Sequence, residues 1–239
     1  MEKLRLDKIV SATGLYSRRE VKALVRQGRI LADGRPVRSA DEKFDPEETE
    51  LLLDGERIDY QEYTYLMMNK PAGVLSATED AKGRTVLSLL PPELQKRNLF
   101  PVGRLDKDTE GLLLLTNDGP LAHELLSPRH HVDKVYYARV EGEVDASDCR
   151  AFAEGMTLGD GLRCMPAQLR IGDAPDTCYV TLQEGKFHQV KRMLADRGKP
   201  VKYLKRLRMG NLTLDSKLSP GAFRFLSSDE LKNLKNFGR

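Results

Sequence analysis

The segment from residue 103 to residue 119 joins a strongly charged loop directly to an apolar run. Its sequence is GRLDKDTEGLLLLTNDG, so three carboxylates and two bases precede the four leucines of Leu112–Leu115. A short apolar run that is bounded by turn residues is typical of a strand buried in a sheet. The pattern therefore predicts a charged loop anchored at the mouth of a buried strand, which is a common way to hold a catalytic carboxylate.

The chain has 239 residues, which is enough for one good hydrophobic core with a small satellite domain. With 40% hydrophobic and 31% charged residues, it has the composition of a globular protein. Apolar runs such as Leu112–Leu115 are far too short to span a bilayer, and the charged first eight residues lack the apolar segment of a signal peptide. Three widely spaced cysteines, Cys149, Cys164 and Cys178, argue against a disulfide framework. We therefore expect a cytoplasmic protein without a membrane partner.

Basic residues gather in two blocks of the sequence. Residues 1–38 hold ten bases and four acids, and residues 186–208 hold nine bases and one acid, whereas residues 39–60 are acidic. Two basic blocks on a chain whose net charge is only +3 predict that a polyanion such as nucleic acid is bound at two places. Solvated surfaces without a partner are the alternative explanation.

The first basic block contains a well-marked helix start. Ser17 and Glu20 have the spacing of a capping box, and the apolar residues that follow recur at helical spacing. A helix is therefore expected from about Arg18 to Gln27, followed by a strand at Ile30 and a turn at Asp33 and Gly34. Its apolar stripe leaves five basic side chains on the remaining surface: Arg18, Arg19, Lys22, Arg26 and Arg29.

This first part of the chain resembles the S4-type RNA-binding domain. The match covers residues 5–8, 17–21 and 27–30 and then the hairpin with Gly34 and Val37. The resemblance implies a small α/β domain over residues 1–60, whose basic helix and hairpin lie on RNA backbone and recognise its shape. Arg18, Arg19, Lys22 and Arg26 would then bind RNA. A basic helical hairpin that docks a protein is the alternative.

The remaining residues, 64–239, predict a second domain of mixed α and β structure. Strands are expected at residues 65–69, 112–116, 135–141, 178–184 and 222–226, and helices at 85–90, 119–126 and 187–197. Because this order does not repeat a strand-helix unit, we expect an α+β fold with a mixed, largely antiparallel sheet flanked by helices, and not a doubly wound fold.

The charged loop and three other segments resemble the pseudouridine synthases of the RsuA family. Residues 70–74 (KPAGV), 134–142 (KVYYARVEG) and 184–193 (EGKFHQVKRM) agree with the family's motifs in order and spacing. The resemblance implies that the protein isomerises uridine to pseudouridine in ribosomal RNA. The 16S rRNA is favoured over 23S rRNA, because the RsuA resemblance includes the S4-type domain. We expect the protein to act on the RNA or on a ribosome assembly intermediate, as a monomer. The alternative is a noncatalytic RNA-binding assembly factor.

The same resemblance assigns residues to the site. By motif position Asp106 is the catalytic carboxylate, Tyr136 stacks on the target uracil, and Lys191 pairs with the aspartate and keeps it ionised. Arg192 is a rival of Lys191, but one helix position turns a side chain by ~100°, so only one of the two should face the pocket. Arg104 would fill the space that the flipped uridine vacates or hold a phosphate, and Arg192 would bind RNA.

Several roles stay open at this point. Asp108 and Glu110 share the loop of the catalytic carboxylate and are expected to fix its hydrogen bonds. The carboxylate could attack the sugar, attack the pyrimidine ring or remove a ribose proton. The basic run 199–208 is expected to bind flanking RNA strands. An isomerisation needs no cofactor, and the four histidines and three cysteines lack the spacing of a metal site.

Overall fold

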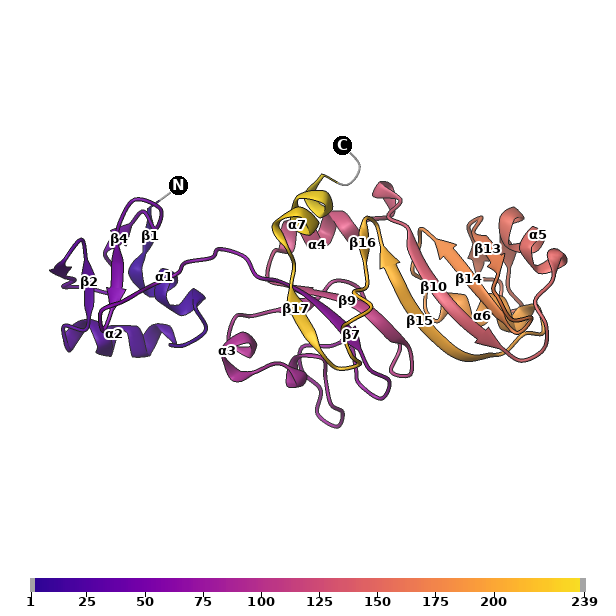
Figure 1. Ribbon diagram of the computed structural model, residues 1–239, viewed down its shortest axis with the longest axis horizontal. Coiled ribbons are helices and arrows are strands. Elements are labelled where there is room, and N and C mark those ends of the chain that lie inside the picture. Colours follow the sequence, from indigo (N-terminus) through magenta and orange to yellow (C-terminus); the bar gives the residue numbers. More distant parts are fainter. Residues whose placement is uncertain (1–2, 237–239) are drawn as a thin grey trace. The chain divides into compact units, whose positions relative to one another are not determined.

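The computed structural model describes residues 3–236, which form two compact units (Figure 1). The first unit contains the residues up to Thr64 together with Leu90–Leu99, and the second contains Tyr65–Leu89 and the residues from Phe100 onward. Leu90–Leu99 therefore belongs to the first unit, whereas the expected domain limits of 1–60 and 64–239 assign these residues to the second domain. Between residues 3 and 236, no helix is long and apolar enough to cross a membrane.

The first unit packs three helices against short strands. Its elements are β1 (Leu4–Arg5), α1 (Leu6–Ala12), α2 (Arg18–Arg26), β2 (Ile30–Ala32), β3 (Arg35–Pro36), β4 (Lys43–Phe44), β5 (Leu51–Leu53), β6 (Glu56–Arg57) and α3 (Pro92–Gln95). Four strands form an antiparallel sheet in the order β3-β2-β5-β6, and β1 pairs with β4. The core is apolar and includes Leu6, Ile9, Val21, Leu24 and Ile30.

The predicted capping box at the start of α2 is confirmed. The Ser17 hydroxyl accepts a hydrogen bond from the Glu20 amide at 3.3 Å, and the Glu20 carboxylate accepts one from the Ser17 amide at 2.6 Å. Val21, Leu24 and Val25 are buried on one face of the helix. The opposite face exposes four of the basic side chains that the sequence singled out: Arg18, Arg19, Lys22 and Arg26.

The second unit is built on a nine-stranded sheet. Its main path runs in the order β13-β14-β10-β15-β9-β7-β17, with β16 paired to β15 and β8 paired to β9. These strands are β7 (Tyr65–Lys70), β8 (Phe100–Pro101), β9 (Glu110–Thr116), β10 (Lys134–Val140), β13 (Gln168–Ile171), β14 (Thr177–Leu182), β15 (Val201–Met209), β16 (Leu212–Thr213) and β17 (Phe223–Phe225). Among the described strands of this sheet, only β15 and β9 pair in parallel, so the expected mixed, largely antiparallel sheet is confirmed.

Helices and short turns surround this sheet (Figure 1). They are η1 (Leu87–Leu89), α4 (Gly119–Leu126), η2 (Pro128–His130), α5 (Ala146–Glu154), α6 (Gln189–Asp196) and α7 (Ser228–Lys235), and a small hairpin pairs β11 (Met156–Thr157) with β12 (Arg163–Cys164). α5 packs near β13, and α6 packs against β15. The face of the sheet beneath α5 and α6 therefore carries the core of this half of the unit.

The two halves of the sheet meet where β9 passes β15. Glu110 lies opposite Lys205 and Gly111 lies opposite Arg206 in parallel register. Gly111 has a φ of 102°, and a Cβ atom there would lie 2.2 Å from the Arg206 carbonyl oxygen. Only glycine fits this close approach of the two backbones.

The structure corrects four expectations from the sequence. The helix expected over residues 85–90 is only the three-residue turn η1, and the helix expected over residues 187–197 begins at Gln189, because His188 adopts a left-handed conformation with a φ of 51°. α5 was not foreseen. The basic run 199–208 is mostly the inner strand β15, in which side chains alternate between the two faces, and Arg206 is only 3% exposed, so this base is removed from the expected RNA-binding surface.

Lys134 should make stability depend on pH. Burial lowers the pKa of Lys134 from 10.5 to about 8, and the nearby charge of Arg206 acts in the same direction. Between these two values the unfolded chain binds more protons than the folded one, so stability rises with pH in this window. Between about pH 7.5 and about pH 9.5, the free energy of unfolding measured with urea should rise by about 1–2 kcal/mol more in the wild type than in Lys134→Met. The same pH dependence in both proteins would contradict this prediction.

Candidate active site

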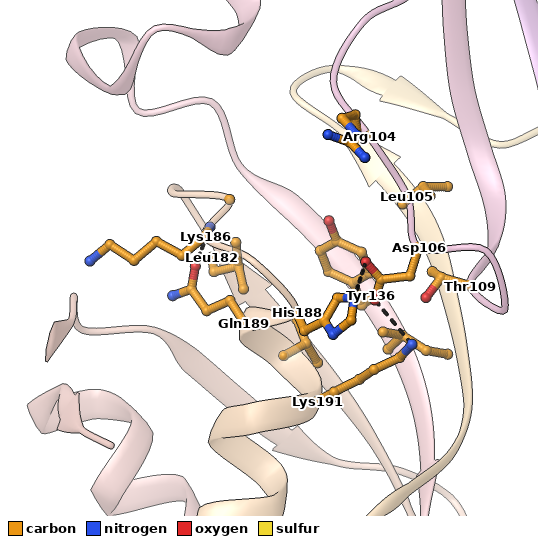
Figure 2. A pocket seen from close by; sticks show the side chains of 13 residues that line it. Arg104, Leu105, Asp106, Thr109, Tyr136, Leu182, Lys186, His188, Gln189 and Lys191 are labelled. Atoms are coloured by element: carbon orange, nitrogen blue, oxygen red, sulfur yellow. Dashed lines mark hydrogen bonds and ion pairs between the residues drawn. The ribbon is translucent and has the colours of Figure 1, made fainter. Parts of the chain in front are cut away.

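A hollow opens in the second unit where the loop before β9 meets the sheet and the first turn of α6 (Figure 2). Its empty volume is about 410 Å³, part of which is open to solvent, so it is a partly open hollow and not an enclosed cavity. Its lining includes Asp106, Tyr136 and Lys191, which are 30 or more residues apart in the sequence. The fold thus brings together the three side chains that were expected to be catalytic.

The Asp106 carboxylate faces two cationic or potentially cationic groups. One carboxylate oxygen lies 3.0 Å from Lys191 Nζ, and the other lies 3.4 Å from His188 Nε2. The Asp106 side chain is 25% exposed, so it is accessible from the hollow but largely surrounded by protein. Asp106 therefore has a cation beside it and one side open to a ligand.

Neighbouring residues fix the backbone of the loop that carries Asp106. The Ser76 hydroxyl donates to the Leu105 carbonyl at 2.9 Å and accepts from the Leu105 amide at 3.0 Å. The Lys107 carbonyl accepts from the Gly73 amide at 2.7 Å. Both partners come from the turn after β7, so this turn and the loop are held as one piece.

Lys70 is the central anchor of this loop, a role that the sequence did not reveal. Its side chain is fully buried, and its ammonium group donates to the carbonyls of Pro71 at 3.0 Å, Lys107 at 3.2 Å and Thr109 at 2.8 Å. Burial lowers the pKa of Lys70 to about 8, while the charges of Asp108 and Asp106 oppose this effect. The lysine-proline motif offered the signal, because a lysine beside a tight turn at the end of a buried strand has few partners other than backbone carbonyls.

Lys191, and not Arg192, contacts the carboxylates of the loop. Lys191 Nζ bonds to Asp108 as well as to Asp106, while the Arg192 guanidinium pairs with Asp160. Burial lowers the pKa of Lys191, but its hydrogen bonds to Asp108 and Asp106 outweigh this effect and the net shift is upward. The same bond from Lys191 lowers the pKa of Asp108. Lys191 therefore stays protonated beside Asp106.

The strand β10 places two adjacent tyrosines on opposite faces of the sheet. Tyr136 is 9% exposed and lines the hollow together with Leu182 and Leu204. Tyr137 lies on the other face, with its ring centroid 5.5 Å from that of Tyr179 and 6.2 Å from that of Tyr203. The floor of the hollow is thus a flat aromatic ring between two apolar side chains, which suits a planar base.

Arg104 and His188 complete the rim. Arg104 is exposed and lines the hollow from the loop side, as Figure 2 shows. His188 was considered in the sequence only as a metal ligand, and its place beside Asp106 was missed. The described residues contain no group of three or more histidine, cysteine, aspartate or glutamate side chains that could hold a metal ion.

Comparison with known protein families decides the identity of this fold. The profile of the family described as RNA pseudouridylate synthase matches residues 64–196, and that of the S4 domain matches residues 4–49. The chain belongs to the RNA pseudouridylate synthase family. The family and the S4-type domain expected from the motifs are therefore confirmed, and the hollow lies in the part of the chain that matches the enzyme profile.

Relatives of the same length support this assignment. The uncharacterized RNA pseudouridine synthase YtzG of Bacillus subtilis (strain 168) is 48% identical over 231 residues, which cover 95% of this chain and 97% of the relative. The ribosomal small subunit pseudouridine synthase A of Yersinia pestis is 38% identical over 233 residues, which cover 97% of this chain and 98% of the relative. A crystal structure of a pseudouridylate synthase matches with a TM-score of 0.68 and 34% identity, covering 97% of this chain and 99% of the other. The protein is an RNA pseudouridine synthase.

The different contacts of Lys191 and Arg192 lead to a test with a matched pair of variants. Lys191→Met should lower kcat on the order of 100-fold, because Asp106 loses its positioned cation. Arg192→Met should leave kcat within about 3-fold of the wild type, because its partner is Asp160. Tritium release from RNA labelled at uracil C5 measures both rates. Circular dichroism controls for folding, and a larger kcat loss for Arg192→Met would contradict the assignment.

Proposed function

We propose that this synthase converts a uridine of ribosomal RNA, and in the first place of 16S rRNA, to pseudouridine, with Asp106 as the catalytic carboxylate. The observation that carries the proposal is the position of Asp106 in the hollow. Its carboxylate lies 3.0 Å from the Lys191 ammonium and shares the hollow with the Tyr136 ring. An ionised oxygen, its cation and a stacking surface are thus present in one site.

The reaction exchanges one bond of the nucleoside for another. The bond from ribose C1′ to uracil N1 breaks, the base turns, and a bond from C1′ to C5 forms, while C5 loses a proton and N1 gains one. Attack of the carboxylate on the ribose, its attack on the pyrimidine ring and its removal of a ribose proton all require an ionised Asp106. In each case the positive charge of Lys191 lies beside the reacting carboxylate, at 3.0 Å.

The site must retain the detached base and keep water from the sugar. Tyr136 offers a face on which uracil stays stacked, and stacking of this kind is worth ~1–3 kcal/mol per base. Leu182 and Leu204 beside it exclude water from the floor of the hollow. Both effects favour re-addition of the base over hydrolysis.

Among the described residues that line the hollow, Asp106 is the one that carries a carboxylate. Glycosidases use a pair of carboxyl groups, one of which activates a water molecule or forms a glycosyl intermediate that water cleaves. Here Asp108 is held by Lys191 and its side chain is 75% exposed, and Glu110 accepts a hydrogen bond from the Tyr203 hydroxyl at 2.7 Å. Asp106 therefore acts alone on the ribose or the base.

Two features support ribosomal RNA as the substrate. The exposed basic face of α2 suits the phosphate backbone of a folded RNA, and Lys22 and Arg26 also line a shallow hollow with Arg38. The relative from Yersinia pestis, which this chain matches along almost its whole length, is named a small-subunit enzyme. For Arg104 we propose a separate RNA contact. It fills the space that the flipped uridine vacates, or it binds a phosphate.

The catalytic role of Asp106 can be tested directly. Asp106→Asn should lower tritium release from 16S transcript labelled at uracil C5 by at least about 1000-fold, because an amide can neither attack nor accept a proton. Asp173→Asn, at an exposed loop position, is the matched control and should keep the wild-type rate. Unchanged release by Asp106→Asn would refute the assignment.

Mapping of pseudouridines in cells with and without the protein identifies the rRNA, and loss of a 23S site alone would refute the 16S substrate.

The proposed binding of RNA by α2 predicts a change in salt dependence. Replacing its four exposed bases by glutamine should weaken RNA binding and flatten the plot of log affinity against log salt by ~0.7–0.9 for each phosphate that is no longer neutralised. The variant carries these changes: Arg18→Gln, Arg19→Gln, Lys22→Gln and Arg26→Gln. Filter binding to rRNA at several salt concentrations measures the slope. A slope equal to that of the wild type would show that α2 does not bind the backbone.

A further inference from the structure

Phe187 is an apolar side chain in an unusually open position. It is 75% exposed, whereas the next most exposed large apolar residue among those described, Leu15, is 54% exposed. Exposed phenylalanine contributes little to the core and leaves apolar surface in water. Phe187 directly precedes His188, the N-cap of α6 and a lining residue of the hollow, so its open ring lies beside the site at which RNA would bind.

Phe187 stacks on a residue of the hollow. Its ring centroid lies 3.8 Å from that of His188, and the two planes differ by 20°. His188 in turn lines the hollow, with Nε2 3.4 Å from the Asp106 carboxylate. The two rings thus form a short stack that begins beside the catalytic carboxylate and ends with the solvent-exposed ring of Phe187.

The segment that carries this stack is held in one conformation. His188 has left-handed backbone angles and ends the loop at the N-cap of α6. Gln189 is buried, donates to Glu184 and accepts from the Lys186 amide at 3.0 Å. Bonds on both sides of Phe187 therefore fix the backbone, and the ring is presented to a ligand with little further ordering.

We propose that Phe187 stacks on an unpaired RNA base next to the target uridine, which extends the proposed function and rests on it. Flipping the uridine into the hollow removes the stacking partner of each neighbouring base. The exposed ring of Phe187, two rings away from Asp106, offers one of these bases a new partner. An aromatic face accepts any base, so this contact adds affinity without reading the sequence.

Steady-state kinetics on the rRNA transcript that the wild type modifies test the proposal. Phe187→Ala and Phe187→Leu should both raise KM about 5- to 50-fold, because neither keeps an aromatic face. They should leave kcat within about 2-fold, and Phe187→Tyr should restore KM to within about 2-fold of the wild type. Phe225→Ala is the matched control and should leave KM unchanged, since Phe225 is another exposed phenylalanine, at 50%, but lies on β17.

Other kinetic results would overturn the proposal in distinct ways. An unchanged KM in Phe187→Ala would exclude the stacking interaction, and so would a fall in kcat alone, which would mean that the ring only positions His188. If the wild-type protein forms no pseudouridine in either rRNA, the proposed function fails instead. The two failures are therefore distinguishable in one assay.

Fluorescence tests the stacking itself. A stem-loop with the mapped uridine and with 2-aminopurine at the adjacent 5′ or 3′ nucleotide is bound to Asp106→Asn protein, which prevents turnover. The chain has no tryptophan, so the emission belongs to the probe. At one of the two positions, 2-aminopurine should fluoresce less when bound to Asp106→Asn than when bound to the double variant Asp106→Asn, Phe187→Leu. Stacking on an aromatic ring quenches this fluorescence. Equal emission for both probes would overturn the proposal.

Discussion

The parallel pairing of β9 with β15 is the constraint on which the active site depends. β9 follows the loop of Asp106, whereas β15 pairs on its other edge with β10, which carries Tyr136. Gly111 allows the two strands to approach so closely that a Cβ atom would lie 2.2 Å from the Arg206 carbonyl oxygen. α6 precedes β15 and packs against it, so the same pairing also sets the distance from Asp106 to Lys191.

Buried cations hold this junction and the loop beside it. The Arg206 guanidinium donates from Nε to the Leu112 carbonyl at 2.8 Å, and the Lys70 ammonium bonds to three carbonyls of the turn and the loop. Burying a charge is costly unless its hydrogen bonds are made, and Nη2 of Arg206 has no partner among the described residues. The buried cations thus lower the stability of the fold, but their hydrogen bonds hold a short charged loop in one conformation. Such a trade-off is common at functional sites.

Local signals in the sequence predicted much of the fold. The capping box of Ser17 and Glu20 and the leucine run of β9 both depend on residues a few positions apart. The family motifs supplied the side chains that meet in the hollow. Contacts between distant residues were harder to read. The charges of 199–208 hid an inner strand, the lysine-proline motif did not say which loop carbonyls Lys70 would bind, and nothing local indicated that His188 would leave the helix.

The energetics of base flipping explain why one small hollow is joined to two different kinds of RNA contact. Unstacking a uridine costs a few kcal/mol, and the hollow returns part of this through the Tyr136 ring. Phosphate contacts of the kind proposed for α2 add affinity that falls steeply with salt and is equal for stacked and flipped states. Only contacts that form after flipping favour the flipped state. A ring such as Phe187, which meets a base once its neighbour has left the stack, acts on this difference, so its contribution should persist at salt concentrations that weaken the basic surface.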